Sequence, residues 1–269
     1  MAGAQAAEAR SKDRASATPL LKLSKVNKNF GAVQALTGVD LEIYPGEVVA
    51  LVGDNGAGKS TMIKTISGIW SPDGGQIFWD GKEVNVRNPR DAAALGIATM
   101  YQDLALCDNL DIVQNMFLGR EPRRLGLLDE TAMEISARKT LSDLSVTTVR
   151  SIRQPVGSLS GGQRQAVAVA RAVLEDARLV IMDEPTAALG VSQTAMVLNL
   201  VKTLSERGVA VLIISHNLVD VFQVADHIAV LYLGHVAGTY PASELDTQRA
   251  VELITTGALG SANAAGGRK

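Results

Sequence analysis

A glycine-rich stretch that ends in lysine and serine carries the clearest chemistry in the sequence. Glycines let successive backbone N–H groups turn toward phosphate oxygens, a helix N-terminus adds positive potential, lysine adds a point charge, and a hydroxyl can bind Mg²⁺. The stretch therefore predicts a nucleoside triphosphate site, and a glycine-rich turn without a ligand is the alternative. It matches G-x-x-x-x-G-K-[ST] at every fixed position and consists of Gly53, Asp54, Asn55, Gly56, Ala57, Gly58, Lys59 and Ser60, followed by Thr61.

The elements around this stretch fit the same interpretation. Residues 47–52 form a short, β-branched apolar run, which is typical of a buried parallel strand. Residues 59–67 carry apolar side chains at Met62, Ile63 and Ile66, and this spacing predicts a helix. Strand, glycine loop and helix thus come in the order that a phosphate-binding loop requires.

Two acids follow another apolar run. Residues 179–182 predict a buried strand that ends at Asp183 and Glu184, and Pro185 prevents its continuation. A carboxylate beside phosphates suits a hard cation, so we expect Asp183 to bind Mg²⁺ together with Ser60. Glu184, one residue further on, is then the candidate general base or water-positioning residue. A solvated turn acid is the alternative for Asp183.

A histidine ends a third apolar run. Residues 209–214 predict a strand that leads into Ser215 and His216. Ligands of parallel α/β sheets bind at the carboxyl ends of the strands, which is where the glycine loop, the two acids and this histidine all lie. On its own His216 is more often an ordinary packed or surface residue, and His227 and His235, which lack this context, are interpreted that way.

Composition excludes several classes of protein. The 269 residues are 46% hydrophobic and carry 26 Lys+Arg against 28 Asp+Glu, so a sizeable core is available and nucleic acid is not expected as a partner. The single cysteine, Cys107, cannot form an internal disulfide, and a reducing compartment is the default. The longest apolar stretches, residues 209–214 and 228–233, are far shorter than the roughly 20 residues that span a bilayer.

The remaining pattern predicts an α/β fold with three parts. Strands that alternate with helices predict a mostly parallel sheet, preceded by an antiparallel β part that begins near residue 20. Helical spacing between about 103 and 172 predicts an inserted α-helical part. We expect one domain over residues 19–256, with disordered tails at 1–18 and 257–269. The expected helices lie at 91–95, 113–118, 131–144, 164–174, 191–207, 217–225 and 246–255.

One further stretch makes the pattern specific, and it consists of Leu159, Ser160, Gly161, Gly162 and Gln163. It is similar to the signature loop of ATP-binding-cassette (ABC) proteins, which other phosphate-loop classes lack. Together with the glycine loop, the two acids and the histidine, it makes the chain resemble the ATP-binding subunit of an ABC transporter from about residue 21 to 255. The resemblance implies a P-loop NTPase (RecA-like) core and an ATPase that uses ATP and Mg²⁺.

The resemblance also implies roles for single residues. Glu184 matches the catalytic carboxylate and His216 the switch histidine that contacts the γ-phosphate. Gln102 matches the glutamine that reaches Mg²⁺ or the attacking water from the junction with the helical part. Phe30 stands where the family has an aromatic ring that stacks on adenine, a contact that contributes about 1 to 3 kcal/mol. A polar strand terminus and a core phenylalanine are the respective alternatives.

The assembly implied by the resemblance is a head-to-tail pair. The signature residues of one subunit would close over ATP bound by Lys59 of a second ATP-binding subunit, either a copy or a similar chain. Integral membrane permease subunits would dock at the helical part on the cytoplasmic face of the inner membrane, and a solute-binding protein would deliver cargo. One departure stands out, because Gly190 replaces the aspartate that the family commonly has.

The loops suggest a cargo class. The loop sequences of residues 101–106 and 115–122 resemble those in ATP-binding subunits of bacterial importers for simple sugars such as ribose, xylose or fructose. Importers of branched-chain amino acids are the nearest alternative. A soluble, non-transport ABC ATPase or a P-loop kinase remains a less favoured interpretation, since a kinase leaves the signature stretch unused.

Overall fold

A six-stranded sheet forms the centre of the molecule. The computed structural model describes residues 17–146, 148–174 and 176–258. The strand order is β12-β11-β3-β10-β9-β6, and every neighbouring pair is parallel except β11 and β12. The strands are β3 (Val48–Val52), β6 (Ile97–Met100), β9 (Leu179–Asp183), β10 (Ala210–Ile214), β11 (His227–Tyr232) and β12 (His235–Pro241).

The central strands β3 and β10 are apolar throughout because both faces of the sheet are covered. In β3 all five residues are buried, and they alternate between two cores. Val48, Ala50 and Val52 pack on the side of the later helices, whereas Val49 and Leu51 pack on the opposite side. This continuous apolar run is what a parallel strand buried on both faces requires.

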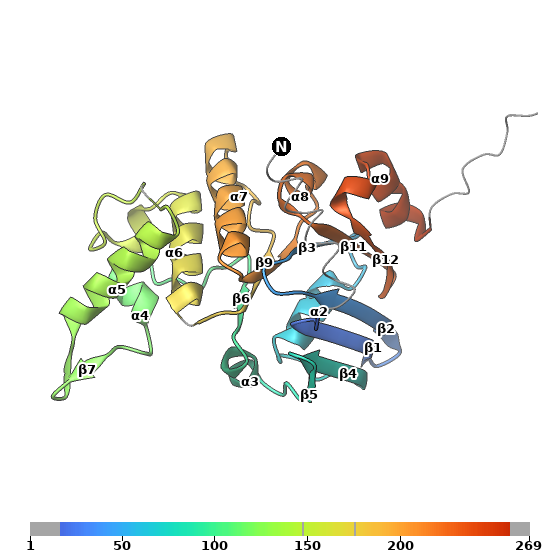
Figure 1. Ribbon diagram of the computed structural model, residues 1–269, viewed down its shortest axis with the longest axis horizontal. Coiled ribbons are helices and arrows are strands. Elements are labelled where there is room, and N and C mark those ends of the chain that lie inside the picture. The colour runs from blue at the N-terminus through green and yellow to red at the C-terminus, as the bar shows by residue number, and fades with distance from the viewer. Residues whose placement is uncertain (1–16, 147, 175, 259–269) are drawn as a thin grey trace, which may run out of the picture.

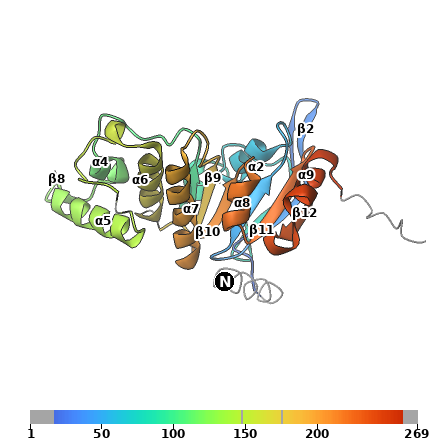
Figure 2. The same cartoon turned by 90° about the horizontal axis from the view of Figure 1, so that it is seen from above.

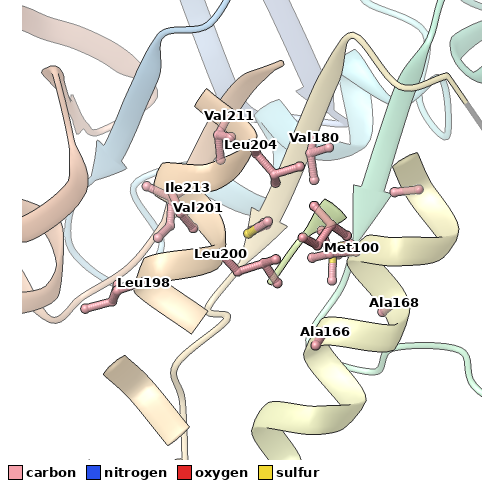
Figure 3. Close-up of a cluster of buried hydrophobic side chains, with 14 of the residues drawn as sticks. Met100, Ala166, Ala168, Val180, Leu198, Leu200, Val201, Leu204, Val211 and Ile213 are labelled. Atoms are coloured by element: carbon pink, nitrogen blue, oxygen red, sulfur yellow. The ribbon is translucent and has the colours of Figure 1, made fainter. Parts of the chain in front are cut away.

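The first core lies between the sheet and α7 (Val191–Glu206), α8 (Leu218–Val224) and α9 (Thr247–Thr256), and it continues into the helical part, where Met116, Ala137 and Ala170 belong to the same cluster. Figure 3 shows Leu200, Val201 and Leu204 of α7 directed toward the side chains of the neighbouring strands. The spacing of these three residues puts them on one face of the helix. Within the described part of the chain, no helix is long and apolar enough to cross a bilayer.

The second core lies between the sheet, the helix after the glycine loop and an antiparallel sheet. That helix is α2 (Lys59–Ile66), and the antiparallel strand order is β2-β1-β4-β5. The strands are β1 (Leu21–Phe30), β2 (Val33–Ile43), β4 (Gly74–Trp79) and β5 (Lys82–Val84), and the short α3 (Pro89–Ala94) leads from them back to β6.

A third group of elements lies at the opposite end of the molecule from α9 in both views (Figures 1 and 2). It contains α4 (Ile112–Phe117), α5 (Glu130–Asp143) and α6 (Gly161–Leu174). The sequence predicted only helices here, but a small hairpin also occurs, formed by β7 (Arg123–Arg124) and β8 (Leu127–Leu128). Its two-residue strands are too short to show an alternating pattern. Two single-turn 3-10 helices, η1 (Val156–Ser158) and η2 (Ala242–Glu244), were not predicted either.

The predicted fold class is confirmed: a mostly parallel sheet with helices, and a separate antiparallel sheet. The limits set for the domain, 19–256, and for the helical insertion, about 103–172, stay predictions. The expected tails lie almost entirely outside the described residues. Gly257, where the second tail was expected to begin, has φ +73° and ends α9 through a hydrogen bond to Leu253.

Candidate functional site

The glycine loop turns sharply between β3 and α2. Gly58 has φ +107°, and a Cβ atom on it would lie 2.6 Å from the carbonyl oxygen of Ala35. A Cβ atom on Gly53 would overlap the carbonyl oxygen of Leu231. Both positions therefore need glycine, because other backbone segments approach the loop closely. The loop is thereby held against β2 and β11, with α2 beginning at Lys59.

Lys59 is bound by its own loop. Its ammonium donates hydrogen bonds to the carbonyl oxygens of Gly53 at 2.7 Å and Asp54 at 2.9 Å. Partial burial lowers the pKa of Lys59, and the nearby carboxylates of Glu184, Asp54 and Asp183 offset this only in part. A phosphate group beside Lys59 would add further negative charge and so favour the charged form of the lysine.

An open groove of about 530 Å³ runs along this loop. It brings together nine of the residues that the sequence singled out, from three separate segments of the chain. Predicted residues that line the groove are Asn55, Gly56, Gly58, Lys59, Ser60, Thr61, Gln102, Asp183 and Glu184. The start of β2, at Val33, Gln34 and Ala35, forms another wall.

The two acids differ in their environment. Asp183 is the last residue of β9, and burial, followed by the charge of Glu184, raises its pKa. Glu184 has φ +51°, an uncommon conformation for a residue other than glycine, and its N–H donates to Ile214 at 2.9 Å. This turn directs the two carboxyl groups into one groove. His216 Nδ1 lies 2.8 Å from Glu184 Oε2 while most of the imidazole stays exposed.

Besides the Glu184–His216 contact, a second side-chain pair joins the segment after β9 to the segment after β10, and the sequence did not reveal it. The hydroxyl of Thr186 donates to Asp220 Oδ2 at 2.8 Å, and both side chains are buried. Thr186 lies two residues after Glu184, and Asp220 lies four residues after His216 in the first turn of α8. The only signal in the sequence was an acid near the start of the short helix after His216. By itself such an acid indicates only a favourable interaction with the helix N-terminus.

The donor set fits Mg²⁺. Ser60 Oγ, the Asp183 carboxylate and the Gln102 amide oxygen are hard oxygen ligands, and all three residues line the groove. Among the described residues no group of three or more His, Cys, Asp or Glu side chains could hold a metal. A cation in the groove would therefore complete its shell with water and phosphate oxygens, as Mg²⁺ commonly does.

The signature residues lie elsewhere in the fold. None of the five is among the residues described as lining the groove. The sequence predicted a loop that feeds a helix from Arg164, but α6 already begins at Gly161. Ser160 precedes it, with reciprocal hydrogen bonds to Gln163: its N–H donates to Gln163 Oε1 at 2.9 Å, and the Gln163 N–H donates to Ser160 Oγ at 3.3 Å.

The two signature glycines are closely packed, although the nearest atoms are the ends of flexible side chains. A Cβ atom on Gly161 would lie 2.5 Å from Leu189 Cδ2, and one on Gly162 would lie 2.5 Å from Met196 Cε. Leu159 is buried behind them. The start of α6 is thus packed onto α7 and the segment before α7. The N–H groups at this helix start are not described as part of the ATP groove of the same chain.

The other predicted positions are partly resolved by the structure. Phe30 ends β1 just before the groove wall and is 42% exposed, so the alternative of a core phenylalanine is wrong. His227 is buried, with Nδ1 2.7 Å from Glu47 Oε1, which agrees with its interpretation as an ordinary packed histidine. Gly190 is the N-cap of α7, and a Cβ atom there would meet nothing within 4 Å.

Comparison with known proteins gives close relatives. The family model described as ABC transporter matches residues 36–187. The xylose/arabinose import ATP-binding protein XylG of Sulfolobus acidocaldarius is 48% identical over 91% of this chain and 97% of its own length. The fructose import ATP-binding protein FrcA of Rhizobium meliloti is 50% identical over 80% of this chain and 86% of its own length. The ribose import protein RbsA 1 of Rubrobacter xylanophilus is 44% identical over 83% of this chain, which spans 44% of that protein.

Solved structures agree with the fold. A nucleotide-free ATP-binding cassette from an ABC transporter superposes with a TM-score of 0.75 at 26% identity, covering 89% of this chain and 96% of that one. A dimeric, post-hydrolysis cassette, MJ0796 bound to ADP and phosphate, superposes with a TM-score of 0.68 at 26% identity, covering 82% and 98%. With the groove, the signature helix and these relatives in agreement, the chain belongs to the ABC transporter family and is one of its ATP-binding cassette ATPases.

Proposed function

We propose that the chain is the ATP-hydrolysing subunit that powers a membrane importer for a simple sugar. The observation that carries this proposal is the division of the site. Lys59, Asp183 and Glu184 share one groove, while the signature residues lie outside it on the helical side. The sugar is suggested by relatives named for xylose or arabinose, fructose and ribose import.

The groove residues divide the work of hydrolysis. Lys59 and the loop N–H groups hold the β- and γ-phosphates, and Phe30 stacks on the adenine. Ser60, Asp183 and Gln102 would hold Mg²⁺, which when bound would neutralise charge on the phosphate oxygens. Glu184 accepts a proton from the attacking water, whose oxygen bonds to the γ-phosphorus as the bond to ADP breaks. His216, 2.8 Å from Glu184, orients that carboxylate and contacts the γ-phosphate.

Two copies of the chain complete the site. Ser160, Gly161 and Gly162 of one copy would place the N-terminus of α6 against the γ-phosphate held by the other, where helix N–H groups favour an anion. Binding of ATP would then close a head-to-tail dimer, and hydrolysis would open it. Such a pair has two equivalent composite sites, as expected for a closed, symmetric dimer.

The membrane partner has a candidate docking groove. A groove of about 280 Å³ lies between α3, β6 and α6, and its lining includes Tyr101, Asp103, Leu104 and Ala105, on both sides of Gln102 in the sequence. A permease segment in this groove would contact the residues that link the ATP groove to the helical part. We therefore place the chain on the cytoplasmic face of the inner membrane, bound to integral permease subunits that receive sugar from a solute-binding protein.

Transport by the assembled complex tests this proposal. The chain would be purified with its permease from native membrane and reconstituted in vesicles, and ATP-driven uptake of xylose, fructose and ribose would be compared with uptake of leucine. We expect ATP-dependent uptake of one sugar and none with Glu184→Gln. Uptake of leucine alone would support the branched-chain amino acid alternative, and copurification without any membrane protein would favour a soluble ABC ATPase.

A further inference from the structure

An aromatic residue that no motif includes lies beside Phe30. Trp70 follows α2, and its ring centroid is 4.6 Å from that of Phe30, with the two planes at 70°. This edge-to-face arrangement is a favourable geometry for two aromatic rings. The two residues are 40 positions apart in the chain, so the contact depends on the fold.

The backbone after α2 fixes Trp70. Gly68 has φ +73°, which ends the helix, and a Cβ atom there would lie 2.5 Å from the carbonyl oxygen of Asn88. The N–H groups of Ile69 and Trp70 then donate to the Lys64 carbonyl oxygen at 2.9 and 3.1 Å. The Lys64 ammonium lies 4.7 Å from the centroid of the Trp70 ring, within reach of a cation–π interaction.

The loop that carries Trp70 is also bonded to the end of β1. Lys28 Nζ pairs with Asp73 at 2.9 Å and donates to the Ser71 carbonyl oxygen at 2.8 Å. The N–H of Asn29 donates to Asp73 Oδ2 at 2.6 Å. These bonds hold the two residues before Phe30 against the loop after Trp70, so the two rings meet in one fixed corner.

This corner adjoins the ATP groove. Phe30 precedes the groove wall at Val33 by three residues, and Lys64 lies one helical turn after Thr61, which also lines the groove. In either edge-to-face arrangement Trp70 can cover at most one face of the Phe30 ring. The Lys28 ammonium also lies over the Phe30 ring, 5.6 Å from its centroid, and 42% of Phe30 stays exposed between these two contacts.

We propose that Trp70 is a positioning residue for the nucleotide base, because it fixes the orientation of the partly exposed Phe30 ring that stacks on the base. This inference rests on the proposed function of Phe30 as the ring that stacks on adenine. A free phenylalanine at the end of a strand would rotate about two side-chain bonds and lose that freedom on binding. With Trp70 in place, part of that ordering exists before the nucleotide arrives.

Binding of ADP and of pyrophosphate to the full chain tests the proposal, because only ADP carries a base. We expect Trp70→Ala to weaken ADP binding about two- to tenfold and to leave pyrophosphate binding unchanged. Trp70→Phe, which keeps a ring, should restore most of the ADP affinity. Unchanged ADP affinity in Trp70→Ala, or an equal loss of pyrophosphate affinity, would overturn the proposal.

Phe30→Ala separates this inference from the function it rests on. If Phe30→Ala binds ADP as well as the wild type, the base site of the proposed function is itself wrong. If Phe30→Ala weakens ADP binding and Trp70→Ala does not, only the role of Trp70 fails.

Fluorescence gives a second readout, which probes the base site with Trp70 and Phe30 both unchanged. The chain has two tryptophans, Trp70 and the buried Trp79 of β4. In Trp79→Phe, Trp70 is the only indole, and its emission should change when ADP binds but not when pyrophosphate binds. If the Trp70 emission does not change at ADP concentrations where calorimetry shows binding, the result would contradict a base site beside Trp70.

Discussion

The folded chain disfavours the charged forms of two groups in the ATP groove and favours those of the groups around Arg153. In the groove, burial lowers the pKa of Lys59 and raises that of Asp183, so the charged form of each is disfavoured. Around Arg153, hydrogen bonds lower the pKa of Glu134 and raise that of the arginine, so both charged forms are favoured.

The difference follows from the partners each region supplies. Arg153 lies 3.1 Å from Asp111, 2.8 Å from Glu130 and 2.7 Å from Glu134, and it thereby joins the start of α4 to the first turns of α5. The groove holds a strained Glu184 backbone and a lysine that, within the described part of the chain, donates to the carbonyl oxygens of its own loop. One region is complete within the chain, whereas the other, under the proposed function, would be completed by phosphate, a cation and a second subunit.

The largest effect is expected from Glu184→Gln. Loss of the proton acceptor should lower ATP turnover by roughly 10²- to 10⁴-fold. The neutral amide keeps the shape of the side chain and removes a negative charge next to Asp183, so the thermal midpoint of the nucleotide-free protein should not fall. Steady-state phosphate release and a melting curve check both parts, and turnover near the wild-type rate would sink the assignment of Glu184.

Arg153→Met should have the reverse profile. Methionine keeps the apolar stem but removes three ion pairs, so the thermal midpoint should fall by a few degrees while ADP affinity stays the same. Because the pKa of Glu134 is lowered by Arg153, this stabilisation is present at neutral pH and is lost as the pH falls through the folded-state pKa, below the ordinary value of 4.5.

The pH dependence of Arg153→Met can be measured directly. The gap in melting temperature between wild type and Arg153→Met should stay constant from pH 7 to about 5 and narrow below about 4.5. A gap that stays constant down to pH 3 would show that Arg153 stabilises the chain by packing and not by its charge.

Asp183→Asn should stabilise the nucleotide-free protein. The raised pKa of Asp183 means that its ionised form is less favourable in the folded chain than in the unfolded chain, so stability decreases as the pH rises through that pKa. The neutral amide removes this effect, and the melting temperature at pH 7 should rise. With ATP and Mg²⁺ the order should reverse, since the wild type gains more from the ligand. A lower melting temperature without nucleotide would contradict the comparison.

Much of the groove was predictable because it is built from local patterns. The glycine loop, Asp183 and Glu184 each follow an apolar strand directly, and parallel strands bring their carboxyl ends together whatever the rest of the chain does. The Thr186–Asp220 and Phe30–Trp70 contacts were not predictable, since they join segments 34 and 40 residues apart whose approach depends on packing. The β7–β8 hairpin was not predicted because strands of two residues are too short to show alternating polar and apolar side chains.

The smallest effect is expected from Gly190→Asp. Gly190 caps α7 in an extended conformation with open space around its Cα, and an aspartate would add the capping bond that Asp111 and Asp129 provide to α4 and α5. The free energy of unfolding should rise by about 0.5 kcal/mol. Gly190→Ala is the matched control, because it limits the unfolded chain without adding a cap; equal gains in both variants would rule out capping.

The central claim is that each ATP site is shared by two copies of the chain, and mixing two defective variants tests it most directly. Lys59→Ala removes the phosphate contact and Ser160→Arg blocks the signature helix, each in a Glu184→Gln background that retains ATP. In a head-to-tail pair of the two variants, the intact Lys59 of the Ser160→Arg chain faces the intact Ser160 of the Lys59→Ala chain. One of the two sites is thereby restored, and the other carries both defects. We predict that neither variant alone retains ATP on gel filtration and that the mixture retains about one ATP per dimer; retention in the mixture no greater than in the separate variants would contradict the shared site.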